Sequence, residues 1–166
     1  MILSRCFNLL TATALLLLHA SGVAGQQFGG IEAASVVPPA PVALKPNAEI
    51  VVPLMVRIRA GYHINSHTPF EDYLIPTKLT WQAAPLSLKK TEYPDGEIVA
   101  YEFSEQPLSV YSDKIVIKST FRTPEKIPAG LTEIPGKLRY QACTDKACLP
   151  PRTIEVAVPV HFASDR

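Results

Sequence analysis

The chain has 166 residues, and 16 lysines and arginines against 15 aspartates and glutamates give it a formal net charge of +1. Such a balance provides no basic surface for a polyanion, which excludes nucleic acid as the expected partner. Sixteen prolines are spread along the chain and leave no window long enough for a helix, which argues against a helical fold.

Residues 1–25 have the features of a secretion signal. Arg5 gives a positive start, Phe7–Leu18 is an almost unbroken apolar run, and small residues around Val23–Gly25 offer a cleavage site. The run is shorter than the roughly 20 residues that cross a membrane as a helix, and no later segment is apolar enough to do so. We therefore expect an exported protein that loses Cys6 with its signal and keeps two cysteines, without a membrane span.

Residues 26–40 are rich in small residues, glycine and proline, and are predicted to form a flexible leader before a single domain, residues 41–166. The clearest strand is Ile50–Arg59, where apolar residues alternate with more exposed ones. Further strands are predicted at Lys78–Trp81, Leu86–Thr91, Leu108–Tyr111, Lys114–Phe121, Gly136–Cys143 and Thr153–Phe162.

Seven or eight short strands separated by turn signals predict an all-β protein, an immunoglobulin-like β-sandwich. A barrel remains an alternative at this point. Two segments, Gly61–Pro76 and Tyr93–Gln106, fit no strand and are predicted to be long loops. Long loops on a rigid scaffold are where functional residues usually lie.

The two remaining cysteines, Cys143 and Cys148, lie between the last two predicted strands with four residues between them. This spacing is compatible with a hairpin that places them opposite one another, with a Cα separation of about 4.5–5.5 Å. Disulfide geometry allows that distance, and an oxidising compartment favours the bond.

A bridge across so short a loop stabilises the fold only weakly. In the chain-entropy model a loop of roughly six residues contributes about 2 kcal/mol, against about 4.7 for a hundred residues. A redox-active pair that opens without disturbing the sheet is therefore predicted. The alternative is a structural disulfide in a non-catalytic binding or assembly module of the cell envelope. The thioredoxin pattern is absent, since Pro150 and Pro151 prevent a helix after Cys148.

Three segments in order carry a family resemblance: GYHINSHTPFEDYLIPTKLTW, then YPDGE with YEFSE, then YQACTDKACLPP. Together they resemble the N-terminal periplasmic domain of the transmembrane thiol:disulfide interchange protein DsbD, over roughly Ala40–Phe162. The resemblance implies an immunoglobulin-like domain of the protein-disulfide reductase type, without a cofactor. Such a domain takes electrons from a thioredoxin-like domain and passes them to periplasmic acceptors, including a disulfide isomerase.

The resemblance also implies roles for individual residues. Cys148 matches the cysteine that forms the mixed disulfide with a partner, and Cys143 matches the one that resolves it. Phe103 matches a phenylalanine of a cap loop that shields the sulfurs, and Glu102 matches an acid beside it. The membrane and thioredoxin-like domains of the family do not occur in this sequence, so we expect electrons to arrive from another chain.

Three positions depart from the family pattern. Tyr101 stands where well-known members carry a second acid, and His63 and Asn65 stand where they carry tyrosines. These departures affect the fine tuning of the site and leave the cysteine chemistry in place.

The same residues allow simpler interpretations. Phe103 could be an ordinary core residue, because a lone aromatic in a β-protein usually packs inside. His63 and His67, four apart, could bind zinc or copper with both thiols, but Pro69 argues against a helix that would align them, and no metal is predicted. The acids of the second loop are expected to form a solvated rim, namely Glu97, Glu102 and Glu105.

Overall fold

The structure, a computed structural model, describes residues 32–163; the predicted signal peptide, residues 1–25, lies outside them. Within this part the regular secondary structure is all strand, and no helix is long and apolar enough to cross a membrane. The chain is an all-β, immunoglobulin-like sandwich, as predicted.

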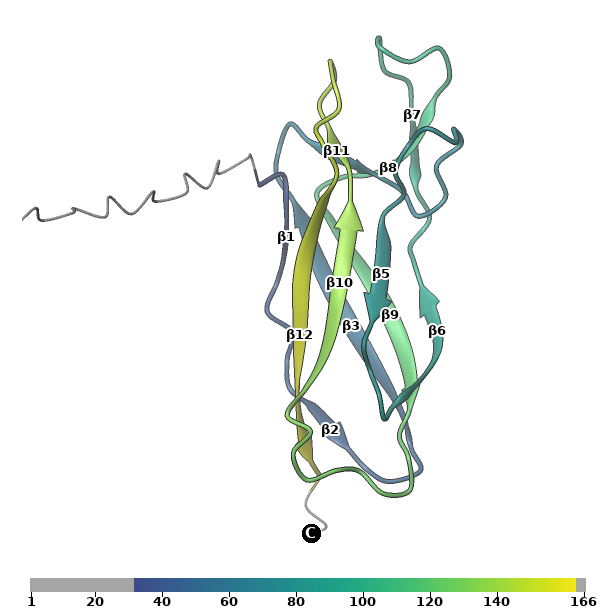
Figure 1. The fold of residues 1–166 in the computed structure, drawn as a ribbon. Coiled ribbons are helices and arrows are strands. Elements are labelled where there is room, and N and C mark those ends of the chain that lie inside the picture. The colour runs from purple at the N-terminus through teal and green to yellow at the C-terminus, as the bar shows by residue number, and fades with distance from the viewer. Residues whose placement is uncertain (1–31, 164–166) are drawn as a thin grey trace, which may run out of the picture. The chain divides into compact units, whose positions relative to one another are not determined.

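Two four-stranded sheets form the body of the sandwich (Figure 1). The first has the order β1 (Ala34–Val36), β3 (Glu49–Ile58), β9 (Lys114–Arg122), β6 (Ser87–Glu92). The second has the order β2 (Val42–Leu44), β12 (Arg152–Phe162), β10 (Glu133–Tyr140), β5 (Lys78–Trp81). β2 pairs with β12 in parallel, and the other pairs are antiparallel. Separate sheets with open edges contradict the barrel alternative.

The core lies between these sheets because alternation places one face of each long strand inside. On β3, every second residue from Ile50 to Ile58 is buried, and Leu54 is fully covered. β10 and β12 supply the facing side chains, among them Leu138 and Val158. Packing of this apolar area is the main driving force for the fold.

Residues 34–36 belong to the body, although the sequence suggested a flexible leader as far as residue 40. β1 pairs with β3, and the backbone N–H of Arg59 donates to the carbonyl of Ala33 over 2.8 Å. Ala33 and Ala34 are buried in the main core. The leader prediction is therefore wrong here, because small side chains let this segment pack as an edge strand.

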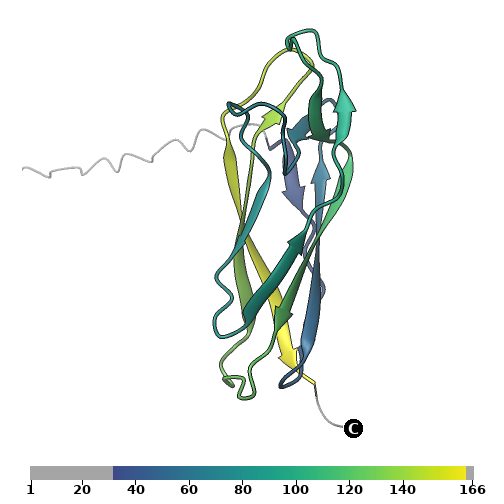
Figure 2. The same cartoon turned by 90° about the vertical axis from the view of Figure 1, so that its right-hand side faces the viewer.

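A third sheet forms at one end of the sandwich, with the order β11 (Ala142–Cys143), β4 (His63–Asn65), β8 (Leu108–Tyr111), β7 (Glu97–Val99). β4 and β7 lie within the two segments predicted to be loops, so those predictions were wrong at these positions. The hairpin after β11 and the connection between β7 and β8 lie at this same end (Figures 1 and 2). The strand pairings of this third sheet place three distant stretches of sequence beside one another.

Candidate functional site

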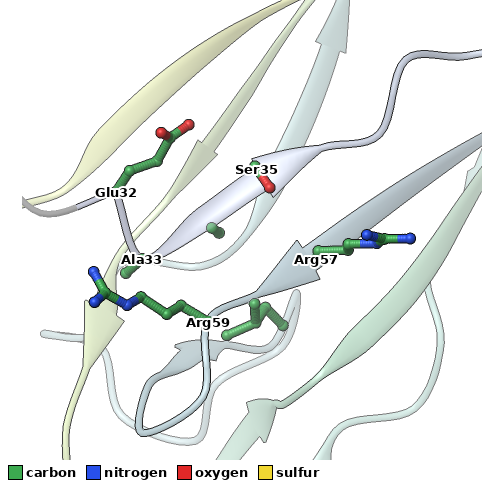
Figure 3. A pocket seen from close by; sticks show the side chains of 7 residues that line it. Glu32, Ala33, Ser35, Arg57 and Arg59 are labelled. Carbon is green, nitrogen blue, oxygen red and sulfur yellow. The ribbon is translucent and has the colours of Figure 1, made fainter.

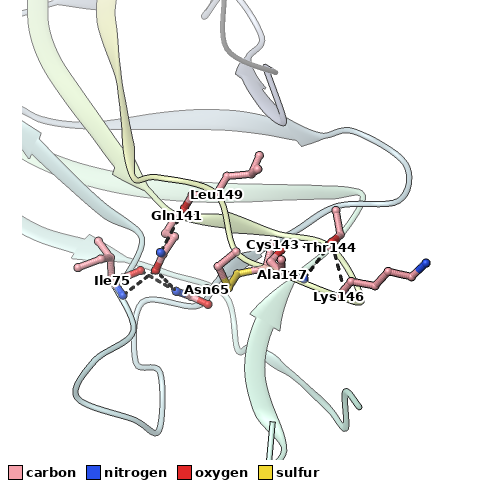
Figure 4. Close-up of a disulfide and its surroundings, with 9 residues drawn as sticks. Asn65, Ile75, Gln141, Cys143, Thr144, Lys146, Ala147 and Leu149 are labelled. Atoms are coloured by element: carbon pink, nitrogen blue, oxygen red, sulfur yellow. Dashed lines mark hydrogen bonds between the residues drawn. A yellow bond between two sulfur atoms is a disulfide. The ribbon is translucent and has the colours of Figure 1, made fainter. Parts of the chain in front are cut away.

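The two cysteines form a disulfide across a hairpin that begins with β11. Cys143 and Cys148 are directly paired in antiparallel register, and their sulfurs are 1.99 Å apart (Figure 4). The predicted hairpin is confirmed, but the Cα separation of 3.8 Å is shorter than expected. The ladder hydrogen bonds fall on the residues either side, so the pair occupies a non-hydrogen-bonded position, where antiparallel strands approach most closely.

The turn of this cysteine hairpin, residues 144–147, is organised by its own hydrogen bonds. The backbone N–H of Thr144 donates to the carbonyl of Ala147 over 2.9 Å. The Thr144 hydroxyl oxygen accepts from the N–H groups of Lys146 and Ala147, each over 3.2 Å. A turn closed in this way does not depend on the disulfide for its shape.

The two sulfurs lie in opposite environments. Cys143 has no exposed surface, whereas Cys148 is exposed at the start of the returning segment. Thiol-disulfide exchange requires a partner to reach one sulfur along the line of the bond that breaks. Only Cys148 offers that access.

A polar network joins the cysteine hairpin to β4. The Asn65 amide nitrogen donates to the carbonyl of Ile75 over 3.0 Å and to the Gln141 side-chain oxygen over 3.3 Å. The Gln141 amide nitrogen in turn donates to the carbonyl of Leu149 over 3.2 Å, just beyond the second cysteine (Figure 4). Asn65 thus lies near the site, whereas Gln141 was missed from the sequence, although it stands two residues before Cys143 in the cysteine segment.

His63 lies opposite Cys143 in the register of β4 with β11. Its ring is 4% exposed and stacks on Tyr101, with ring centroids 4.2 Å apart, and Tyr101 stacks on Phe103 at 5.5 Å. Burial lowers the pKa of His63. Burial, followed by the charge of Glu97, raises the pKa of Tyr101. We call His63, Tyr101 and Phe103 the ring stack; it connects β4 to the cap loop, residues 100–107.

Phe103 ends the ring stack at the surface, where 39% of it is exposed, so the core interpretation of this residue is wrong. Glu102 is exposed beside it, as are Glu97 and Glu105. That Phe103 shields the sulfurs stays a prediction, since its described contact is with Tyr101.

His67 belongs to a separate group. Its ring stacks on Tyr93 at 3.7 Å, and its Nδ1 lies 3.0 Å from the carbonyl oxygen of Thr77. His63 and His67 therefore contact different tyrosines. Within residues 32–163 no group of three or more histidine, cysteine or acidic side chains is placed to hold a metal ion.

Polar contacts hold the segment after β4 and the segment before β7 against β8. The Ser109 hydroxyl donates to that of Ser66 over 2.8 Å, and the Tyr111 hydroxyl donates to the carbonyl of Pro94 over 2.9 Å. Gly96 passes so close to Ser109 and Ser66 that a Cβ would overlap both side chains. The turn signal at YPDGE marked this segment, but the close approach could not be predicted.

A pocket of about 330 Å³ lies elsewhere, between β1 and the end of β3 (Figure 3). Glu32, Ser35, Arg57 and Arg59 provide its polar side chains. It includes none of the cysteine-site residues. We assign no function to it.

Comparison with known proteins identifies the family. The family model described as "Thiol:disulfide interchange protein DsbD, N-terminal" matches residues 33–159, most of the chain. The chain belongs to this family. The resemblance expected from the cysteine segment and the two upstream motifs is thereby confirmed, and the DsbD N-terminal match includes every residue of the ring stack and both cysteines.

Two solved structures are similar to this DsbD-type domain. The reduced DsbD N-terminal domain of Neisseria meningitidis is 21% identical, covering 75% of this chain and 84% of that one, with a TM-score of 0.45. The N-terminal periplasmic domain of ScsB from Proteus mirabilis is 10% identical, covering 76% of this chain and 46% of that one, with a TM-score of 0.47. No curated protein sequence matches the chain.

Proposed function

We propose that this domain exchanges thiols and disulfides with thioredoxin-fold proteins in the periplasm, using Cys148 as the attacking and Cys143 as the resolving cysteine. The observation that carries the proposal is the difference in exposure between two bonded sulfurs, one accessible and one fully covered. Membership of the DsbD N-terminal family supports the reaction class, and the periplasmic ScsB domain among the similar structures supports the compartment.

The exchange balances as two successive displacements. In the reduced domain the Cys148 thiolate attacks a partner disulfide, forms a mixed disulfide and releases one partner thiolate. The Cys143 thiolate then attacks the Cys148 sulfur, closes the internal disulfide and releases the second partner thiolate. Two electrons pass to the partner, and the domain ends oxidised. The reverse sequence recharges it from a reduced donor.

The surface near the cysteine hairpin supports a protein partner. Phe70 and Tyr73 are 59% and 71% exposed on the segment between β4 and β5, and Phe103 is exposed on the cap loop. Exposed aromatic side chains are enriched where proteins dock. The cap loop would move aside when the partner approaches Cys148.

Trapping tests this proposal directly. Reduced Cys143→Ser protein, mixed with an oxidised thioredoxin-fold protein, is expected to accumulate a covalent complex that dithiothreitol dissolves. The matched Cys148→Ser protein, which retains the buried thiol, should form none. Electrophoresis without reductant measures both. Complex formation by the Cys148 variant instead would reverse the proposed roles.

The alternative, an envelope binding module with a structural disulfide, predicts a different potential. Structural disulfides of secreted proteins have reduction potentials below about −300 mV, whereas a relay lies nearer its partners. Equilibrium titration against glutathione, followed by thiol alkylation, gives the value. A potential in the structural range, with no electron transfer from the reduced wild type, would overturn the relay.

A further inference from the structure

The resolving cysteine has a chemical difficulty that its position creates. Cys143 is fully buried, and burial in apolar surroundings disfavours a thiolate. Yet it must lose a proton before it attacks the mixed disulfide, since the thiolate is the nucleophile. Water has no access to this side chain in the closed structure. A neighbouring group that accepts the proton would remove the difficulty.

His63 is the titratable group that the sheet places beside it. The two residues are directly opposed in the antiparallel register of β4 with β11, so their side chains lie on the same face. Opposed residues of such strands have Cβ atoms about 4.5–5.5 Å apart, close enough for an imidazole to reach a thiol.

One nitrogen of His63 is available for this role. Nε2 is buried and has no hydrogen-bond partner among the described residues. Buried polar atoms normally find a partner, so an unpaired nitrogen at a redox site points to a function in another state of the protein. In the disulfide form Cys143 has no proton to offer; in the dithiol form it has one.

The surroundings keep this imidazole neutral and fixed. Burial is the cause that lowers its pKa, so at neutral pH it can accept a proton. Tyr101 covers one ring face, and burial raises the pKa of that phenol, which therefore stays uncharged. Of the titratable groups facing His63, Cys143 comes from β11 and Tyr101 from the cap loop. β8 pairs with the following residues, Ile64 and Asn65.

We infer that His63 is the proton acceptor for the Cys143 thiol in the resolving step, an inference that rests on the proposed function. The Cys143 proton moves to Nε2 of His63, and the thiolate attacks the Cys148 sulfur of the mixed disulfide. The bond between Cys148 and the partner breaks, and the partner leaves as a thiolate. That thiolate, or solvent as the partner leaves, then takes the proton from the imidazolium.

A small aromatic disulfide reagent separates the two displacements without a protein partner. Reduced protein releases one coloured thiolate when Cys148 attacks the reagent, in a step that depends on reagent concentration. It releases a second coloured thiolate when Cys143 closes the internal disulfide, in a step whose rate is independent of reagent concentration. The Cys143→Ser variant, which should release only the first, identifies the phases.

His63→Phe keeps an aromatic ring to stack on Tyr101 and removes both nitrogens. We expect the second release to slow by about twentyfold or more between pH 9 and pH 7 in this variant, because the ionised fraction of an unassisted thiol falls by at least that factor over this range. The wild type should change by less than about threefold over that range, while a general base supplies the proton acceptor. The first release should be equal in both, because Cys148 is exposed.

The control is His161→Phe, at an exposed histidine near the far end of β12. It should leave both phases unchanged. Identical pH profiles for wild type and His63→Phe would overturn the inference. A wild type that closes its disulfide in this assay but transfers no electrons to thioredoxin-fold proteins would refute the proposed function and leave the role of His63 intact.

Proton NMR of the unaltered protein gives a second measurement, should the variant fold poorly. If the Cys143 thiol donates a hydrogen bond to Nε2 of His63, reduction should lower the titration midpoint of the His63 ring, because that hydrogen bond stabilises the neutral imidazole. His161 should not change. An identical His63 midpoint in the two redox states would contradict the inference.

Discussion

The body of the sandwich and its cysteine end are held together by different interactions. In the body, apolar side chains from β3, β9, β10 and β12 form one large core. Its two described ion pairs, Lys90–Glu92 and Lys137–Glu155, are exposed and contribute little. At the cysteine end a small apolar cluster, Leu74, Leu108 and Val110, lies beside buried polar residues, with hydrogen bonds around Asn65 and ring contacts around Tyr101.

This contrast is consistent with the proposal that the domain opens at its cysteine end when a partner docks. Apolar packing is cooperative, so the body is lost as a whole. Hydrogen bonds and ring stacks at the end involve few side chains each, and local opening requires breaking only those. We therefore expect the cap loop to move without unfolding the sheets beneath it.

The largest effect is expected from a cavity in the body. Leu54→Ala removes a fully buried side chain and should lower the free energy of unfolding by about 3 kcal/mol or more. Urea denaturation measures it. Val51→Ala on the same strand is the control: this residue is 54% exposed, and a change above about 0.5 kcal/mol there would contradict the assignment of the two faces.

A smaller effect is expected from overpacking the cysteine end. Gly96→Ala forces a Cβ into Ser109 and Ser66 and should cost about 1–3 kcal/mol. Gly130→Ala meets nothing within 4 Å and should be nearly neutral. If the cysteine end can open independently of the body, amide hydrogen exchange in the Gly96 variant should become faster around β8 first. Uniform quickening over β3 and β9 would show one cooperative unit instead.

Reducing the disulfide is expected to change the free energy of unfolding by about 2 kcal/mol or less, because the bridge closes a very short loop. The hairpin turn keeps its hydrogen bonds in either state, since Thr144 supplies them. Denaturation with and without dithiothreitol provides the measurement. Unfolding of the domain on reduction alone would show that the bridge is structural.

The smallest change in stability is expected from a substitution in the cap loop, which should nevertheless alter the rate at which the disulfide is reduced. Phe103→Ala removes a side chain already 39% exposed and should alter unfolding by about 0.5 kcal/mol or less. If Phe103 shields the sulfurs, reduction of the disulfide by dithiothreitol should accelerate several-fold. Phe70→Ala, at another exposed phenylalanine, should not accelerate it. Equal rates for wild type and Phe103→Ala would remove the cap from the mechanism.

Much of the body could be predicted because its pattern is local. On β3 each residue's neighbours along the chain already define an inward and an outward face, and the same holds on β12. The three-residue strands β1, β2, β4 and β7 were missed, since so few positions cannot show a period. On β4 all three residues are buried, so no alternation exists there to find.

The sequence by itself determined the sandwich, the pairing of Cys143 with Cys148 and the family. Only the tertiary structure decided which sulfur is exposed, that His63 lies opposite Cys143, and that Asn65 reaches Gln141 from 76 residues away. The physical reason is the distance along the chain over which each kind of interaction acts. Alternation and turn chemistry act between near neighbours in the chain, whereas burial and cross-strand contact depend on how distant strands pair.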